Sequence, residues 1–71
     1  MDFWPFNRYP VKQQVIVNTK TDKSFKGLLW QKTNDYLILR GARMLRGRDT
    51  PIALDGELII YRDNVDFIQV V

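Results

Sequence analysis

The sequence contains no cysteine and no histidine among its 71 residues. A domain of this size buries only roughly 60% of the surface that its unfolded chain exposes. Small domains usually offset this deficit with disulfides, a bound metal or oligomerisation. Because cysteine and histidine are missing, disulfides are excluded and metal binding is disfavoured, so we expect contacts with a partner or a second copy.

Groups that could perform catalysis are also scarce. Ser24 is the only serine, and no histidine is available to activate it. Asp55 and Asp63 fall in predicted turns, where aspartate typically bonds its own backbone. Glu57 and Asp66 are the other acids near the C-terminus. No glycine-rich phosphate-binding motif precedes a helix, and the sequence therefore predicts neither an enzyme, nor a cofactor, nor a metal site.

Long apolar runs are absent too. No run approaches the ~20 residues that a membrane-spanning helix needs, and the first ten residues lack a signal-peptide pattern. We expect a soluble intracellular product, or a part of something assembled inside a cell. The net charge of +3 is small for a dedicated nucleic-acid-binding protein.

Short strands and polar turns are what the sequence does contain. A hydrophobic content of 45% with 27% charged residues predicts a folded domain. Turn signals at short spacing predict one antiparallel five-stranded β-barrel, of the Sm-like or Src-homology-three-like kind, over residues 11–71. The expected strands are 11–19, 25–32, 36–45, 57–62 and 65–71, and 46–51 is expected to be a loop. Gly27, inside a strand, predicts a bend or a close approach of the backbone.

Several predicted strands carry apolar side chains on both faces, which a single small barrel cannot bury. In the last strand, simple alternation places Val65, Phe67 and Val71 on one face and Ile68 and Val70 on the other. A large exposed apolar surface usually marks an interface. We expect four residues to face a partner from the outside of the barrel: Leu28, Trp30, Ile68 and Val70.

The first ten residues form an aromatic segment interrupted by Pro5 and Pro10. Phe3, Trp4 and Phe6 lie within it. We expect this extended arm either to fold over one end of the barrel or to anchor a partner, since aromatic side chains are enriched at the centres of interfaces.

An arginine cluster lies in the sequence RGARMLRGR. It consists of Arg40, Arg43, Arg46 and Arg48. Arginine matches phosphate and carboxylate groups equally well. Three interpretations are open: ion pairs with Asp49, Asp55 or Asp63, contact with an acidic protein surface, or contact with phosphate groups.

The pattern VIVNTKTDKSFKGLL, LILRGA and ELIIYRDNVDFI resembles the Sm-like family over residues 11–71. This resemblance implies an oligomeric RNA- or DNA-binding protein as one alternative. At the family's nucleotide-binding positions, however, this chain has Asp35, Tyr36, Arg62 and Asp63. A carboxylate at one of these nucleotide-binding positions would repel phosphate.

The segments FKGLLWQK, LILRGARML and DGELIIYRDNVDFIQVV are similar to short proteins encoded among the virion structural genes of tailed phages that infect actinobacteria. This resemblance implies a virion protein assembled in the host cytoplasm. It implies a minor capsid or decoration protein that contacts the major capsid protein, another virion protein or sister copies. A host-directed protein-binding module is a third hypothesis.

Overall fold

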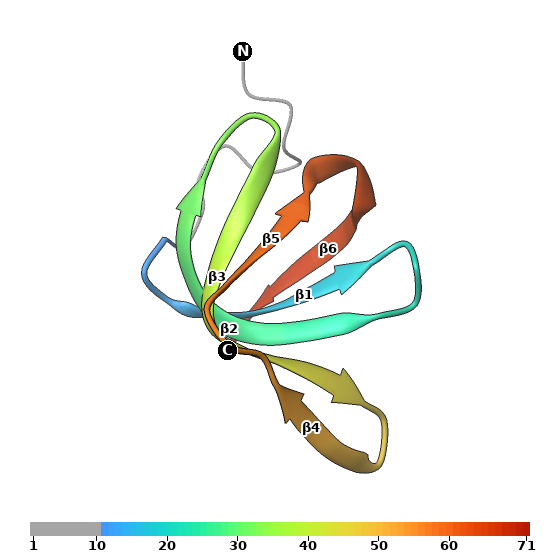
Figure 1. The fold of residues 1–71 in the computed structure, drawn as a ribbon. Coiled ribbons are helices and arrows are strands. Elements are labelled where there is room, and N and C mark those ends of the chain that lie inside the picture. Colours follow the sequence, from blue (N-terminus) through green and yellow to red (C-terminus); the bar gives the residue numbers. More distant parts are fainter. Residues whose placement is uncertain (1–10) are drawn as a thin grey trace.

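The computed structural model describes residues 11–71 and shows an all-β domain, so the predicted fold class is confirmed. The predicted arm, residues 1–10, lies outside the described residues. No helix in residues 11–71 is long and apolar enough to cross a membrane. The elements are β1 (Gln14–Thr19), β2 (Ser24–Lys32), β3 (Tyr36–Arg46), β4 (Asp49–Ala53), β5 (Glu57–Tyr61), the 3-10 turn η1 (Arg62–Asn64) and β6 (Val65–Val70) (Figure 1).

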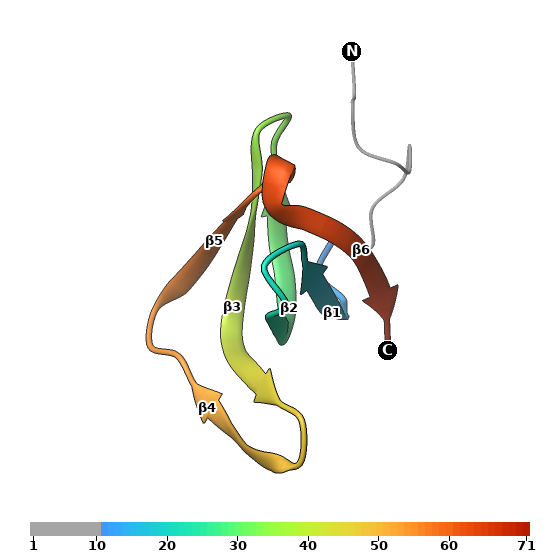
Figure 2. The same ribbon diagram turned by 90° about the vertical axis from the view of Figure 1, so that its right-hand side faces the viewer.

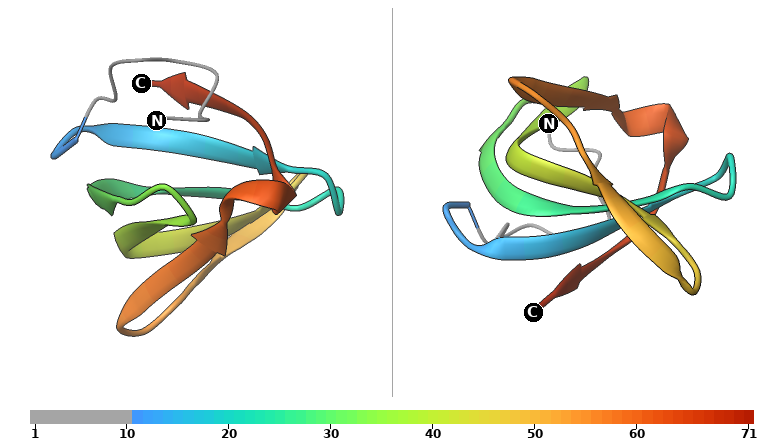
Figure 3. Two further views of the ribbon diagram at one scale, coloured as in Figure 1. Left: turned by 90° about the horizontal axis from the view of Figure 1, so that it is seen from above. Right: turned by 60° about the horizontal axis from the view of Figure 1, so that its bottom comes forward.

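All strand pairs are antiparallel and belong to one sheet. The order is β4-β3-β2-β1-β6, and β5 also pairs with β3. The sheet curls around a single core (Figure 3). Within residues 11–71, β5 and β6 do not pair with each other, so the sheet stays open instead of closing into a barrel.

The prediction of a loop at residues 46–51 is wrong for residues 49–51. Asp49–Ala53 forms a strand, β4, and the domain therefore has six strands instead of five. Arg46 pairs with Asp49, so only Gly47 and Arg48 form the turn, and Gly47 has the positive φ of 60° that such turns require. Pro51 is tolerated because β4 lies at the margin of the sheet. This hairpin extends away from the rest of the domain (Figure 2).

The core consists of alternate residues on the concave face of the sheet. The completely buried side chains are those of Val15, Val17, Leu29, Leu37 and Leu39. Ala42, Ile60 and Val65 complete the buried cluster. The β-branched side chains of Val15 and Val17 in β1 suit a pleated surface that is half buried.

Gly27 allows β2 and β3 to approach closely, as the strand glycine predicts. A Cβ atom at this position would lie 3.1 Å from the Cα atom of Ala42 and 3.1 Å from the carbonyl oxygen of Arg40. The strand register shifts beside it, between Lys26 and Leu28. Such an irregularity bends a strand and increases its twist, which helps the sheet to curl.

Candidate functional site

The convex face of β2, β3 and β5 carries a strip of apolar side chains, here called the outer strip. Because Leu37, Leu39 and Ile60 point into the core, the residues between them point outward. The members of the outer strip are Leu28, Trp30, Tyr36, Ile38, Ile59 and Tyr61.

Two cross-strand pairs join β3 and β5 within the outer strip. Ile38 lies opposite Ile59, and Tyr36 lies opposite Tyr61. The two tyrosine rings meet edge to face, with 6.1 Å between their centroids. Ile59 is 48% exposed and Tyr61 is 64% exposed. The outer strip therefore presents large apolar groups at its β5 margin.

Trp30, at the other margin of the outer strip, is in contact with two cations. The guanidinium carbon of Arg40 lies 3.7 Å from a Trp30 ring centroid, and the ammonium nitrogen of Lys12 lies 5.4 Å from it. Arg40 Nε also donates to Glu57 Oε2 at 2.8 Å. Cation–π contacts and this ion pair fix the orientation of a half-buried indole. Leu28 and Trp30 thus lie on the outer face, as predicted.

The expectation that Ile68 and Val70 lie on the outer face is wrong. Ile68 lies opposite Val17 and packs against the core, and Val70 lies opposite Val15 on the same side. The register between β1 and β6 shifts at Asn18 and Thr19, which breaks the simple alternation in β6.

Phe67 is the apolar side chain of β6 that points outward instead. It lies opposite Asn18 and is 47% exposed. Although Ile68 and Val70 share the core face, they differ in burial: Val70 lies at the open margin of the sheet and is 56% exposed. Val71, the last residue described, is 61% exposed. The C-terminal strand therefore leaves apolar surface uncovered on both of its faces.

A pocket of about 260 Å³ lies on the open side of the sheet. Phe25, Leu58 and Ile60 contribute to it from the sheet, and Thr21 and Lys23 contribute from the β1–β2 turn. The pocket lies beside β5, at the place where a closed barrel would have another strand. Part of the core is accessible there.

The four arginines of the predicted cluster do not form one patch. Arg40 binds Glu57 and Trp30, so its carboxylate partner is not one of the three predicted aspartates. Arg46 Nε donates to the carbonyl oxygen of Thr50 at 3.2 Å, within the β3–β4 hairpin. Arg43 and Arg48 are exposed.

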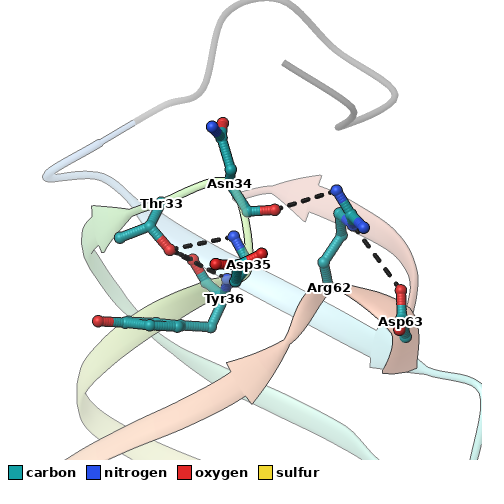
Figure 4. A network of polar contacts seen from close by, with 6 residues as sticks. All are labelled: Thr33, Asn34, Asp35, Tyr36, Arg62 and Asp63. Atoms are coloured by element: carbon teal, nitrogen blue, oxygen red, sulfur yellow. Dashed lines mark hydrogen bonds and ion pairs between the residues drawn. The ribbon is translucent and has the colours of Figure 1, made fainter. Parts of the chain in front are cut away.

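The turns that correspond to the Sm-like nucleotide-binding positions are joined by Arg62 (Figure 4). Its Nη1 donates to the carbonyl oxygen of Asn34 at 3.1 Å, and its backbone N–H donates to the carbonyl oxygen of Asp35 at 2.8 Å. The Thr33 hydroxyl oxygen accepts from the backbone N–H groups of Asp35 and Tyr36 at 3.2 and 3.1 Å.

This network fixes the β2–β3 turn against the end of β5. Arg62 Nε also lies 3.7 Å from Asp63 Oδ1, and the Asp63 side chain is 94% exposed. The guanidinium of Arg62 is therefore engaged in holding the turns, and two carboxylates, those of Asp35 and Asp63, belong to the same turns. The arrangement is suited to rigidity more than to binding a phosphate.

The remaining candidates for chemistry lie apart from one another. In residues 11–71 no three potential metal ligands of the His, Cys, Asp or Glu types come together. The Ser24 hydroxyl donates to the amide oxygen of Asn18 at 2.7 Å. An amide oxygen cannot take a proton as a general base would, so Ser24 lacks an activating partner in this arrangement.

Comparison with known proteins gives a similarity of fold alone. No known protein family matches the sequence, and no curated protein matches it. A chain in the crystal structure of the NatC complex bound to CoA has a similar fold, with a TM-score of 0.75 and 19% identity. The similarity covers 86% of this chain and 78% of that chain.

Proposed function

We propose that this protein is a non-enzymatic assembly protein that binds another protein through the outer strip. The observation that carries the proposal is the exposure of large apolar side chains on a face that the core does not use, above all Ile59 at 48% and Tyr61 at 64%. Ile38 and Trp30 continue this surface across two more strands. Contiguous apolar surfaces of this kind usually mark protein interfaces.

The outer strip combines features of a stable interface. Aromatic side chains and an arginine are the residue types that carry most binding energy at interfaces. Arg40 is already positioned by Glu57 and Trp30, and Tyr61 is supported by Tyr36. Because these side chains are held in place before binding, less of their conformational entropy would be lost when a partner binds.

We further propose that the partner is a virion protein, such as the major capsid protein, or a sister copy of this chain. The sequence resemblance to proteins from phage virion gene modules supports this choice. A similar fold in a chain of the NatC complex supports the more general idea that such a small sheet can serve within a multi-protein assembly. The proposed site of action is the virion, after assembly in the host cytoplasm.

The test compares two exposed isoleucines. Ile59→Glu places a charge in the outer strip, whereas Ile52→Glu places the same charge on β4, where Ile52 is 38% exposed. Both variants should remain folded by circular dichroism, because neither residue belongs to the core. We expect Ile59→Glu to be absent from purified particles and Ile52→Glu to be incorporated normally. Incorporation of both variants at the wild-type level would refute the proposal.

A further inference from the structure

Lys26 and Arg43 form an uncompensated pair of cations on the convex face. They lie directly opposite each other on β2 and β3, and both are exposed. Side chains at such positions begin about 5 Å apart, and like charges there destabilise a sheet. Neither belongs to the ion pairs found in residues 11–71, which join Arg40 to Glu57 and Arg62 to Asp63.

A polar hollow of about 260 Å³ lies between these two cations. Gln14 and Gly41 complete its lining. Gly41 has a φ of 59°, and the position that its Cβ would occupy is open space. The amide of Gln14 adds a hydrogen-bond donor to the two charged side chains. The hollow thus offers several donors, two positive charges and no carboxylate.

We propose that this hollow binds a phosphate group, and that its source is the backbone of a single-stranded nucleic acid. The arginine fork and the lysine ammonium match a group with several acceptor oxygens. Arg46 and Arg48 follow Arg43 along the same hairpin, where Asp49, opposite Arg46, is the one acid of β3 and β4. A polymer with one negative charge per unit can reach several separate cations, which an isolated anion cannot do.

This site borders the outer strip, since Gln14 lies opposite Leu28, but none of the residues that line it belongs to the strip. Binding at the site can therefore be tested without a protein partner. The site also differs from the turns joined by Arg62, which lie at the opposite end of β3 from Arg43 and Arg46. Trp30 is not assigned to base stacking here, because Arg40 already stacks on its ring. Binding therefore depends on phosphate contacts and carries little sequence preference.

The first experiment measures binding of a fluorescent oligouridylate of about 16 nucleotides, the upper range for a small β domain that binds single strands, by anisotropy over a salt series. Lys26→Gln/Arg43→Gln removes both cations, and Lys20→Gln/Lys23→Gln removes the same charge from the β1–β2 turn. Loss of two phosphate contacts should lower the slope of log K against log salt by about 1.4 and weaken binding at low salt by about tenfold or more. The control should retain most of the wild-type slope.

A second variant removes the site while keeping the fold. Gln14→Glu places a carboxylate in the hollow, beside Lys26 and Arg43. We expect it to weaken oligonucleotide binding by about tenfold and to leave the melting temperature unchanged or higher, because the new charge relieves the repulsion between the cations. A variant that binds the oligonucleotide as wild type would count against the assignment.

Competition with other anions identifies the molecule that supplies the phosphate group. If uridine monophosphate binds as tightly as the oligonucleotide, and Lys26→Gln/Arg43→Gln abolishes both, the phosphate assignment holds with a free nucleotide as its source. If polyglutamate of equal length competes equally well, the site recognises an acidic protein and the proposal fails. Equal binding by the site variant and its control would also overturn it. None of these outcomes depends on incorporation into particles.

Discussion

The two halves of β3 differ in burial and therefore in their roles. The first half, which pairs with β5, contributes Leu37 and Leu39, both completely buried. The second half pairs with β4, whose five residues are all exposed. One continuous strand thus supports the core at one end and carries Arg43 and Arg46 into solvent at the other. Stability and charge presentation are therefore separable in this molecule.

The largest expected effect is in the first half of β3. Leu39→Ala should destabilise the domain by about 2–5 kcal/mol, since it removes contacts and leaves a cavity in a small core. Urea denaturation followed by circular dichroism would measure the change. A loss of less than 1 kcal/mol, on the order of a surface substitution, would mean that the two halves do not differ as described.

The next effect is at the contact between β2 and β3. Gly27→Ala places a Cβ atom against the backbone of Arg40 and Ala42, which cannot move without separating the strands. We expect a loss of about 1–3 kcal/mol in the free energy of unfolding. A double-mutant cycle with Ala42→Gly, which has its own cost in the core, should recover only part of this loss, because the contacts with the Ala42 Cα atom and the Arg40 carbonyl oxygen remain. A coupling energy equal to the whole loss would place the strain in the Ala42 side chain alone.

A smaller effect is expected where the two halves of β3 meet. Arg40→Gln removes the ion pair with Glu57 and the contact with Trp30. Both Arg40 and Glu57 are nearly half exposed, so the loss should be about 0.5–1 kcal/mol. A double-mutant cycle with Glu57→Gln would isolate the ion pair. A coupling energy above about 2 kcal/mol would show that solvent screens this pair less than its exposure suggests.

The smallest effect belongs to the hairpin. Ile52→Thr exchanges one exposed β-branched residue on β4 for another. The free energy of unfolding should change by no more than about 0.5 kcal/mol. The same urea denaturation would check this value, and a change comparable to that of Leu39→Ala would erase the contrast between the two halves.

Five of the six strands could be predicted from runs of branched and aromatic residues. The exception, β4, contains Pro51 and follows an arginine-rich turn, a composition that is typical of a loop. Its pairing depends on the two-residue turn at Gly47, which a sequence pattern does not distinguish from a longer loop. The curl of the sheet without closure also depends on pairing between distant strands.

The face of the sheet that each side chain occupies is harder to predict than the positions of the strands in the sequence. A single register shift reverses every later side chain, and the shift opposite Asn18 and Thr19 places Ile68 on the core face. Leu28 and Trp30 were predicted on the correct face because β2 alternates regularly between Gly27 and Trp30. Ile59 and Tyr61 were not among the predicted partner-binding residues. The signal that could have identified them is the pairing of β5 with β3, which places Ile59 opposite Ile38 and Tyr61 opposite Tyr36.

We propose that a protein partner covers the outer strip when the protein is assembled. Hydroxyl-radical footprinting of the protein, free in solution and within purified particles, tests it directly at Tyr61 and Ile59, with Ile52 on β4 as the internal reference. We expect the oxidation of Tyr61 and Ile59 to fall sharply in particles, while the oxidation of Ile52 stays near its value in the free protein. Equal oxidation of Tyr61 in both forms would contradict it.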